Sequence, residues 1–301
     1  MAFSHENHSG NLLPGAMSRR DFFRLAFLAL SCPALYAFPS ESFAQGPLRT
    51  TLIEEFLGEQ LDYQIGFWLI SHCGKALVKL CKSPHRGIYV AQLTGKTVGL
   101  VDWLVGRYRY SYLSYSGYDE KADRLFPLYF KLVKRRKDKV STRTVTFNYK
   151  DQELIFASSR AGTQSHKIIR MRQGILYEDY LTLFYNFRHG YYGAIQRGMT
   201  YHLPLHIHEG FDFLDLTVGS KEEEEVARSQ ELNPKGKDFF VRFRVLKEDV
   251  SSKSGKIVGW LSRDAVPVKG VIKDVIFFGD LWGVLIDRRF TSKYCKKTLL
   301  S

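Results

Sequence analysis

Three histidines at even-numbered positions in residues 201–208 are the chain's strongest candidates for metal chemistry. If this segment is a β-strand, His202, His206 and His208 project from the same face, because side chains alternate along a strand. Three imidazoles with an open fourth position suit zinc and would make the protein a metal-dependent envelope hydrolase. Pro204 interrupts the strand, so a plain polar groove or solvent-facing strand is the competing interpretation.

A second cluster is basic. Lys134, Arg135, Arg136 and Lys137 are consecutive and are expected near a hairpin tip between two strands. Lysine supplies point charges and arginine a planar fork, so the run is a candidate site for a lipid headgroup or a glycan phosphate. A solvated loop is the competing interpretation.

Other catalytic motifs are not found in the sequence. It contains no Gly-x-Ser-x-Gly elbow, no glycine-rich phosphate loop after a strand, and no cysteine beside a plausible base. Whether the protein is an enzyme is therefore open, with a non-enzymatic role favoured. No cofactor is expected, and zinc is the alternative.

Most of the chain alternates between apolar and polar residues with period two, which predicts half-buried β-strands. Val145, Phe147 and Tyr149 alternate with polar neighbours, as do Val241 and Phe243. Glycine-containing and proline-containing turns separate about a dozen such runs. We therefore expect a mainly β fold, built as a curved antiparallel meander in a half-open, barrel-like sheet.

One or two short helices interrupt this pattern. Asp179 is placed to cap a helix over residues 180–187, and residues 98–104 fit a shorter helical turn. The acidic run at residues 221–228 is expected to be a solvated excursion between two strands.

The N-terminal segment carries an export signal. Arg19 and Arg20 precede Phe22 and a short apolar stretch at residues 25–38, which is the twin-arginine pattern. Small residues predict cleavage after Ala44. This divides the chain into a signal peptide (1–44) and a single exported β domain (45–301). We expect the twin-arginine export machinery to be a transient partner and the mature protein to lie in the periplasm or at the outer envelope.

Three alternatives for this segment remain open. Translation from Met17 would make residues 1–16 an upstream extension, and Cys32 raises the possibility of a lipoprotein. A membrane anchor is disfavoured because the apolar stretch is short and contains Pro33, whereas a spanning helix needs roughly 20 apolar residues. We expect no transmembrane span in the mature chain.

The composition is that of a folded, basic protein. The net charge is +13, and 45% of the residues are hydrophobic and 14% aromatic. In an exported protein such charge favours anionic envelope material over nucleic acid, although it also serves plain solubility. Cys73, Cys81 and Cys295 follow the signal; a Cys73–Cys81 disulfide is possible, but nothing in the spacing requires it.

Several landmarks, in order, resemble an exported bacterial family known as domain of unknown function 3108. They cover most of the expected domain and lie at residues 58–63, 74–76, 108–118, 125–130, 179–188 and 260–268. The resemblance implies a curved, mainly antiparallel sheet in an envelope protein. It implies no reaction and no ligand.

The favoured interpretation is a binding or scaffold module with a concave aromatic face for an anionic or amphipathic ligand: a lipid, a lipoprotein or a glycan. Tyrosine and phenylalanine suit such a groove because their rings cover apolar groups. Ordinary sheet core is the competing explanation for each ring.

Overall fold

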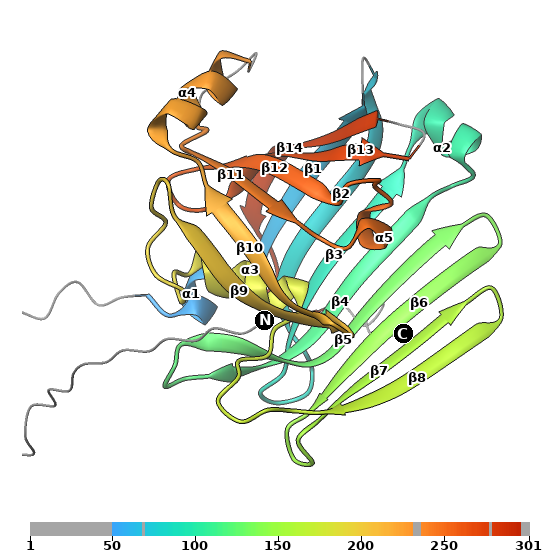
Figure 1. Cartoon of the computed structure of the whole chain (residues 1–301), viewed down its shortest axis with the longest axis vertical. Helices are drawn as coiled ribbons and strands as arrows, with labels where there is room; N and C mark the ends of the chain where they lie inside the picture. The colour runs from blue at the N-terminus through green and yellow to red at the C-terminus, as the bar shows by residue number, and fades with distance from the viewer. Residues whose placement is uncertain (1–49, 68–69, 231–235, 277–278, 296–301) are drawn as a thin grey trace, which may run out of the picture. The chain divides into compact units, whose positions relative to one another are not determined.

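The computed structural model describes residues 50–67, 70–230, 236–276 and 279–295, which belong to one compact unit beginning at Thr50 (Figure 1). Arg19, Arg20, Cys32 and the expected cleavage site after Ala44 lie outside the described residues. The export signal therefore stays a prediction.

Fourteen strands of the described residues form one antiparallel sheet in the order β8-β7-β6-β5-β4-β3-β2-β1-β14-β13-β12-β11-β10-β9. The first eight are β1 (Glu59–Phe67), β2 (Ile70–Lys82), β3 (Tyr89–Thr97), β4 (Arg109–Asp119), β5 (Arg124–Arg136), β6 (Lys139–Asn148), β7 (Glu153–Arg160) and β8 (Thr163–Arg170). The others are β9 (Thr200–His208), β10 (Phe211–Val218), β11 (Phe239–Arg244), β12 (Lys256–Leu261), β13 (Pro267–Val275) and β14 (Gly279–Phe290). Strands that are neighbours in sequence are neighbours in the sheet, except β8 and β9, which form its two edges; β1 and β14, the first and last strands, pair with each other. The predicted meander is therefore confirmed.

Register gives the sheet one apolar inner face. Directly paired residues make a row across five strands: Leu61, Val78, Leu93, Tyr112 and Leu132. Since paired residues share a face, the period-two pattern of each strand places its apolar members on the same side. The apolar residues that alternate along each strand therefore form one continuous apolar layer on the concave face of the sheet.

Five short helices accompany the sheet in the part of the chain that the structure describes. They are α1 (Leu52–Phe56), α2 (Gly99–Val105), α3 (Tyr180–Arg188), α4 (Lys221–Ser229) and α5 (Lys247–Val250). The helix predicted after Asp179 is confirmed, since the Asp179 carboxylate accepts hydrogen bonds from the backbone N–H groups of Leu181 and Thr182. The acidic excursion is itself a helix, because Ser220 and Glu223 form a capping box at its start.

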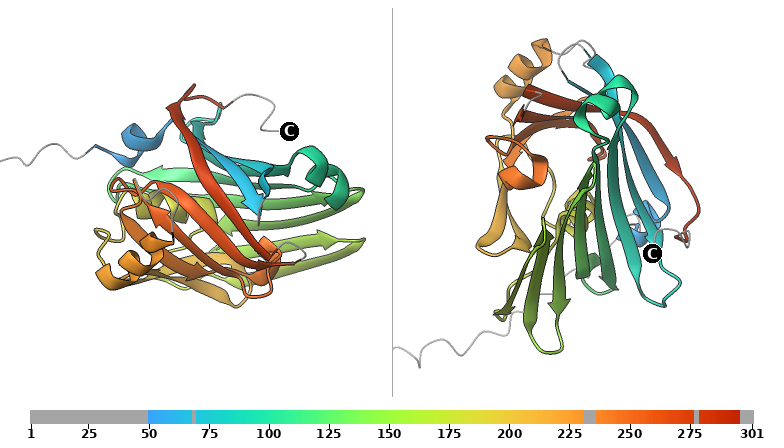
Figure 2. Two further views of the ribbon diagram at one scale, coloured as in Figure 1. Left: turned by 90° about the horizontal axis from the view of Figure 1, so that it is seen from above. Right: turned by 90° about the vertical axis from the view of Figure 1, so that its right-hand side faces the viewer.

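Helix α3 lies inside the curve of the sheet. It contacts β3, β4 and β5 on one side and β9 on the other. We call these two parts of the sheet its two walls, and the ribbon views place the helix between them (Figures 1 and 2). Its buried residues pack into apolar clusters that join both walls. The helix therefore fills one end of the space that the sheet encloses.

The sheet curls without closing. Among the described residues, no backbone ladder joins its outer strands, β8 and β9. Ion pairs connect the two edge regions instead: Lys167 of β8 with Glu209 after β9, and Arg172 after β8 with Asp212 of β10 at 3.3 Å. This matches the predicted half-open sheet. Within the described segments, no helix has the length and apolar character needed to cross a bilayer.

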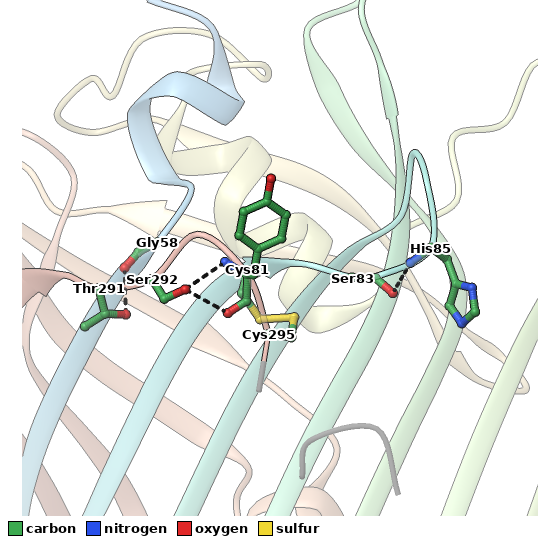
Figure 3. Close-up of a disulfide and its surroundings, with 8 residues drawn as sticks. Gly58, Cys81, Ser83, His85, Thr291, Ser292 and Cys295 are labelled. Carbon is green, nitrogen blue, oxygen red and sulfur yellow. Dashed lines mark hydrogen bonds between the residues drawn. A yellow bond between two sulfur atoms is a disulfide. The ribbon is translucent and has the colours of Figure 1, made fainter. Parts of the chain in front are cut away.

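A disulfide joins Cys81, near the end of β2, to Cys295 beyond β14 (Figure 3). Backbone hydrogen bonds hold the two segments together, including one of 2.9 Å from the Cys295 N–H to the Lys82 carbonyl. The possible Cys73–Cys81 bridge is wrong: both residues lie on β2, where eight residues at about 3.3 Å each separate them far beyond disulfide reach. Cys73 is buried and free.

Candidate ligand-binding cavity

The inner face encloses a cavity of about 980 Å³ between the two walls of the sheet. This volume lies near the upper end of the range for small-molecule sites, about 300–1,000 Å³. Aliphatic and aromatic side chains from both walls line it, among them Ile65, Leu93, Leu214, Val241, Phe243 and Ile257. Leu183, Phe184 and Phe187 of α3 also line it, so the helix forms its floor.

Three tyrosines provide an aromatic wall on one side. Tyr110, Tyr112 and Tyr180 line the cavity, and the Tyr112 ring lies 6.0 Å from that of Tyr110 and 5.9 Å from that of Tyr180. Burial raises the pKa of Tyr110 to about 12 and that of Tyr112 well above its usual value, so both phenols remain neutral. The concave aromatic face expected from the sequence is therefore present in this part of the sheet.

Gly95 makes room for one of these rings. It pairs with Tyr110 across β3 and β4, and a Cβ built on Gly95 would lie 2.0 Å from the tyrosine ring. The Tyr110 ring can lie flat over the neighbouring strand because position 95 has no side chain.

Asp249 on α5 ties the two walls together. Its carboxylate accepts hydrogen bonds from Arg143 of β6 at 2.7 Å and from the Tyr180 hydroxyl at 3.1 Å. Its backbone carbonyl accepts another from the Tyr112 hydroxyl at 3.1 Å. This buried acid is therefore neutralised by a partner and holds α5 across the inner face.

Strand alternation divides the basic run at residues 134–137 between two faces. Lys134 and Arg136 lie on the inner face, where Arg136 lines the cavity, whereas Arg135 points to the other side of β5. Lys137 forms the turn with a φ of 50°, and its aliphatic stem packs on Gly106. Only two of the four predicted ligand contacts therefore face the interior.

A fifth cation joins them from a distant part of the sequence. Arg160, the last residue of β7, also lines the cavity. In the register of the sheet, Ser141 of β6 pairs with Lys134 on one side and with Arg160 on the other. No local motif marks Arg160, because its position across β6 from Lys134 depends on two strand pairings.

Desolvation is the main influence on Lys134. Burial lowers its pKa to about 8, while the nearby acids Asp249 and Glu248 oppose this shift. Its ammonium group donates a hydrogen bond to the Glu248 carbonyl. Lys134 is thus a partly desolvated cation whose charge depends on its neighbours.

The structure does not bring the three predicted metal ligands together. His202 is exposed and bonds Asp215 at 2.6 Å, while His208 donates to the Glu209 carbonyl at 2.7 Å. His206 is buried against the Tyr177 ring, with ring centroids 4.5 Å apart. Among the described residues, no group of three His, Cys, Asp or Glu side chains is arranged to hold a metal ion.

The pairing of β9 with β10 is irregular, since Phe211 pairs with His208 but Phe213 pairs with Pro204. Alternation nevertheless persists, because Tyr201, Leu203, Leu205 and Ile207 all pack in one core cluster. The histidines do not form a site because each has its own surroundings: the His202 ring stacks on Phe213 at 4.1 Å, and His206 packs on Tyr177. Burial lowers the pKa of His206 to about 4, and neither of its ring nitrogens has a hydrogen-bond partner among the described residues. His206 is therefore a neutral core residue in this arrangement.

A curled, unclosed antiparallel sheet around an apolar cavity defines a barrel-like β protein. The chain belongs to the family described as "Protein of unknown function (DUF3108)", whose model matches residues 62–282. The resemblance seen in the sequence is thereby confirmed.

Among solved structures, the chain is similar to a beta-barrel-like protein of domain of unknown function DUF1849 from Brucella abortus. The identity is 11%, the TM-score is 0.41, and the match covers 79% of this chain and 99% of that one. Comparison with curated proteins finds no match.

Proposed function

We propose that this protein is an exported binding module of the periplasm or cell envelope, which holds the apolar part of an amphipathic ligand in its interior cavity. The ligand class is lipid, or the lipid portion of a lipoprotein or glycan. The single observation that carries the proposal is the cavity of about 980 Å³ lined by aliphatic and aromatic side chains from both walls.

Hydrophobic transfer supplies the affinity. Burial of one methylene group contributes about 0.8 kcal/mol, so an acyl chain gains affinity with each carbon until the cavity is filled. The wall tyrosines are neutral and offer rings to the chain, while Asp249 is already paired with Arg143. The interior therefore favours an apolar group over a charged one.

Two features support an extracytoplasmic location. The twin-arginine pattern at Arg19 and Arg20 is an export address, and this route carries folded proteins. The Cys81–Cys295 disulfide is typical of proteins that mature in an oxidising compartment. The basic character of the chain suits association with anionic envelope material.

The test is extraction of bound lipid. The affinity-tagged protein is isolated from the envelope fraction of its host, and organic extracts and native mass spectra are compared with those of an unrelated exported protein. We expect stoichiometric acylated material, and methyl palmitate should bind to delipidated protein. A protein that carries no lipid and binds no methyl palmitate would contradict the proposal.

A further inference from the structure

We infer that the open end of the cavity is a head-group site, in which Arg136 and Arg160, with Lys134 beside them, select an acyl chain that ends in an anionic carboxylate or phosphate. The inference rests on the proposed function, since it names the ligand class of the same cavity. It differs from the predicted four-residue basic loop, because Arg135 and Lys137 are excluded and Arg160 is added.

The sheet register brings these cations to one place. Arg136 and Arg160 are the terminal residues of β5 and β7, two strands that flank β6. Lys134 and Arg160 lie on either side of Ser141, so their Cα atoms are roughly 10 Å apart across two strand spacings. Long flexible side chains at that separation can converge on one anion.

The cavity is polarised from end to end. Its floor is built by Leu183 and Phe187 of α3, whereas Arg136 and Arg160 are exposed at the ends of their strands. An amphiphile fits this gradient in one orientation, with its chain toward α3 and its head toward the arginines. Arginine forks form paired, charge-assisted hydrogen bonds with carboxylate and phosphate oxygens.

The acids near this end already have basic neighbours. Asp249 is matched by Arg143 at 2.7 Å, and Glu248 on α5 lies near Lys134. Arg136 and Arg160 bring two further guanidinium groups to the same end of the cavity. Arg188 also lines the cavity, but two hydrogen bonds bind it to Glu59 on the floor side, so its charge is neutralised.

The experiment compares palmitate with methyl palmitate, which share a chain and differ in head-group charge. Delipidated protein is titrated with each ligand at low and high salt. We expect palmitate to bind at least about tenfold more tightly at low salt, because hydrogen bonds to charged groups are worth that much. The preference should shrink as salt screens the charges.

Three variants locate the site. In the double variant Arg136→Gln/Arg160→Gln the preference should fall to within about twofold, because palmitate binding weakens more than methyl palmitate binding. The double variant Arg136→Lys/Arg160→Lys keeps the charge and should retain most of the preference for palmitate. Arg135→Gln removes an equal charge from the same strand but on the opposite face, and should behave as wild type.

The outcomes separate the two proposals. If neither ligand binds to wild type, both the binding function and the head-group site are wrong. If both ligands bind equally, the cavity function stands and the head-group site is overturned. A palmitate preference that survives in the double glutamine variant, or that is lost equally in Arg135→Gln, overturns the assignment to Arg136 and Arg160. The glutamine variant could lose both ligands, in which case the salt dependence of the wild type decides. A wild-type preference for palmitate that does not change with salt then overturns the assignment to Arg136 and Arg160.

Discussion

Arg188 at the end of α3 and Glu59 at the start of β1 form a bidentate ion pair, with hydrogen bonds of 2.6 and 2.8 Å between side chains that are almost completely buried. The Arg188 guanidinium also lies over the Phe56 ring, 4.5 Å from its centroid. Glu59 accepts a further hydrogen bond from Arg288 of β14 at 2.9 Å. The pair therefore anchors the internal helix to the junction of the first and last strands.

Arg188→Met should destabilise the protein by about 3–5 kcal/mol, because it leaves the buried Glu59 carboxylate without the guanidinium that compensates its charge. Chemical denaturation measures the loss. Arg289→Met is the matched control: its pair with Asp62 at 2.7 Å is partly exposed and should be worth at most about 1 kcal/mol. Equal losses in the two variants would contradict the anchoring role.

Disruption of the disulfide should lower the melting temperature. Cys81 and Cys295 are separated by 214 positions in the sequence. A disulfide that closes so long a loop typically adds about 2–5 kcal/mol to the free energy of unfolding. Cys81→Ser and Cys295→Ser should melt alike, and a reductant should lower the melting point of the wild type only to theirs. In protein that spans residues 45–301, thiol labelling without reduction after unfolding should modify Cys73 alone; labelling of Cys73, Cys81 and Cys295 would refute the bridge.

A bulky side chain inside the cavity should block the ligand. Leu93 lines the cavity, whereas its neighbour Gln92 points to the other face of β3. Leu93→Trp should therefore reduce methyl palmitate binding at least tenfold, about 1.4 kcal/mol, with the fold retained. Gln92→Trp adds the same ring outside and should bind as wild type. Titration measures both, and equal binding would argue against occupancy of this cavity.

Glu178 should make stability depend on pH. It is fully buried, and desolvation raises its pKa from 4.5 to about 7, despite the guanidinium of Arg124 at 3.2 Å. The folded state therefore holds the proton more tightly than the unfolded state. The stability this provides is complete below about pH 4.5 and is lost as the pH rises through about 7.

Glu178→Gln removes this titration. The variant should match wild type at about pH 4.5 and be the more stable of the two at about pH 8. Glu223→Gln is the control: Glu223 is exposed and the hydrogen bond from Arg242 lowers its pKa, so its stabilising contribution is lost only as the pH falls below about 4.5, and the difference from wild type should be constant between about pH 5 and 8. A Glu178→Gln difference that is constant with pH would contradict the raised pKa.

Export should require both arginines of the signal. Replacement of Arg19 and Arg20 with lysine keeps the charge but not the receptor-read pair, so uncleaved precursor should remain in the cytoplasm. Cell fractionation and N-terminal sequencing measure this. Mature protein that starts at Gln45 in the double variant would refute twin-arginine export.

Local chemistry in the sequence was enough to predict the strands as a class and the internal helix. Alternation at Val145 and Phe147 predicted a strand with an inner face, and Asp179 marked the start of the internal helix. These signals work because side-chain parity and capping depend on residues only a few positions apart. Helix α5 escaped notice, since its four residues are too short for a periodic pattern.

The contents of the site were decided by the tertiary structure. Strand pairing placed Arg160 across β6 from Lys134, turned Arg135 to the other face, and put Cys295 rather than Cys73 next to Cys81. The three histidines, whose even spacing had predicted a shared metal, have separate partners: Asp215 for His202, the Tyr177 ring for His206 and the Glu209 carbonyl for His208. Each of these results depends on register between segments distant in sequence. Register is set by how the whole sheet buries its apolar face, so no single segment contains it.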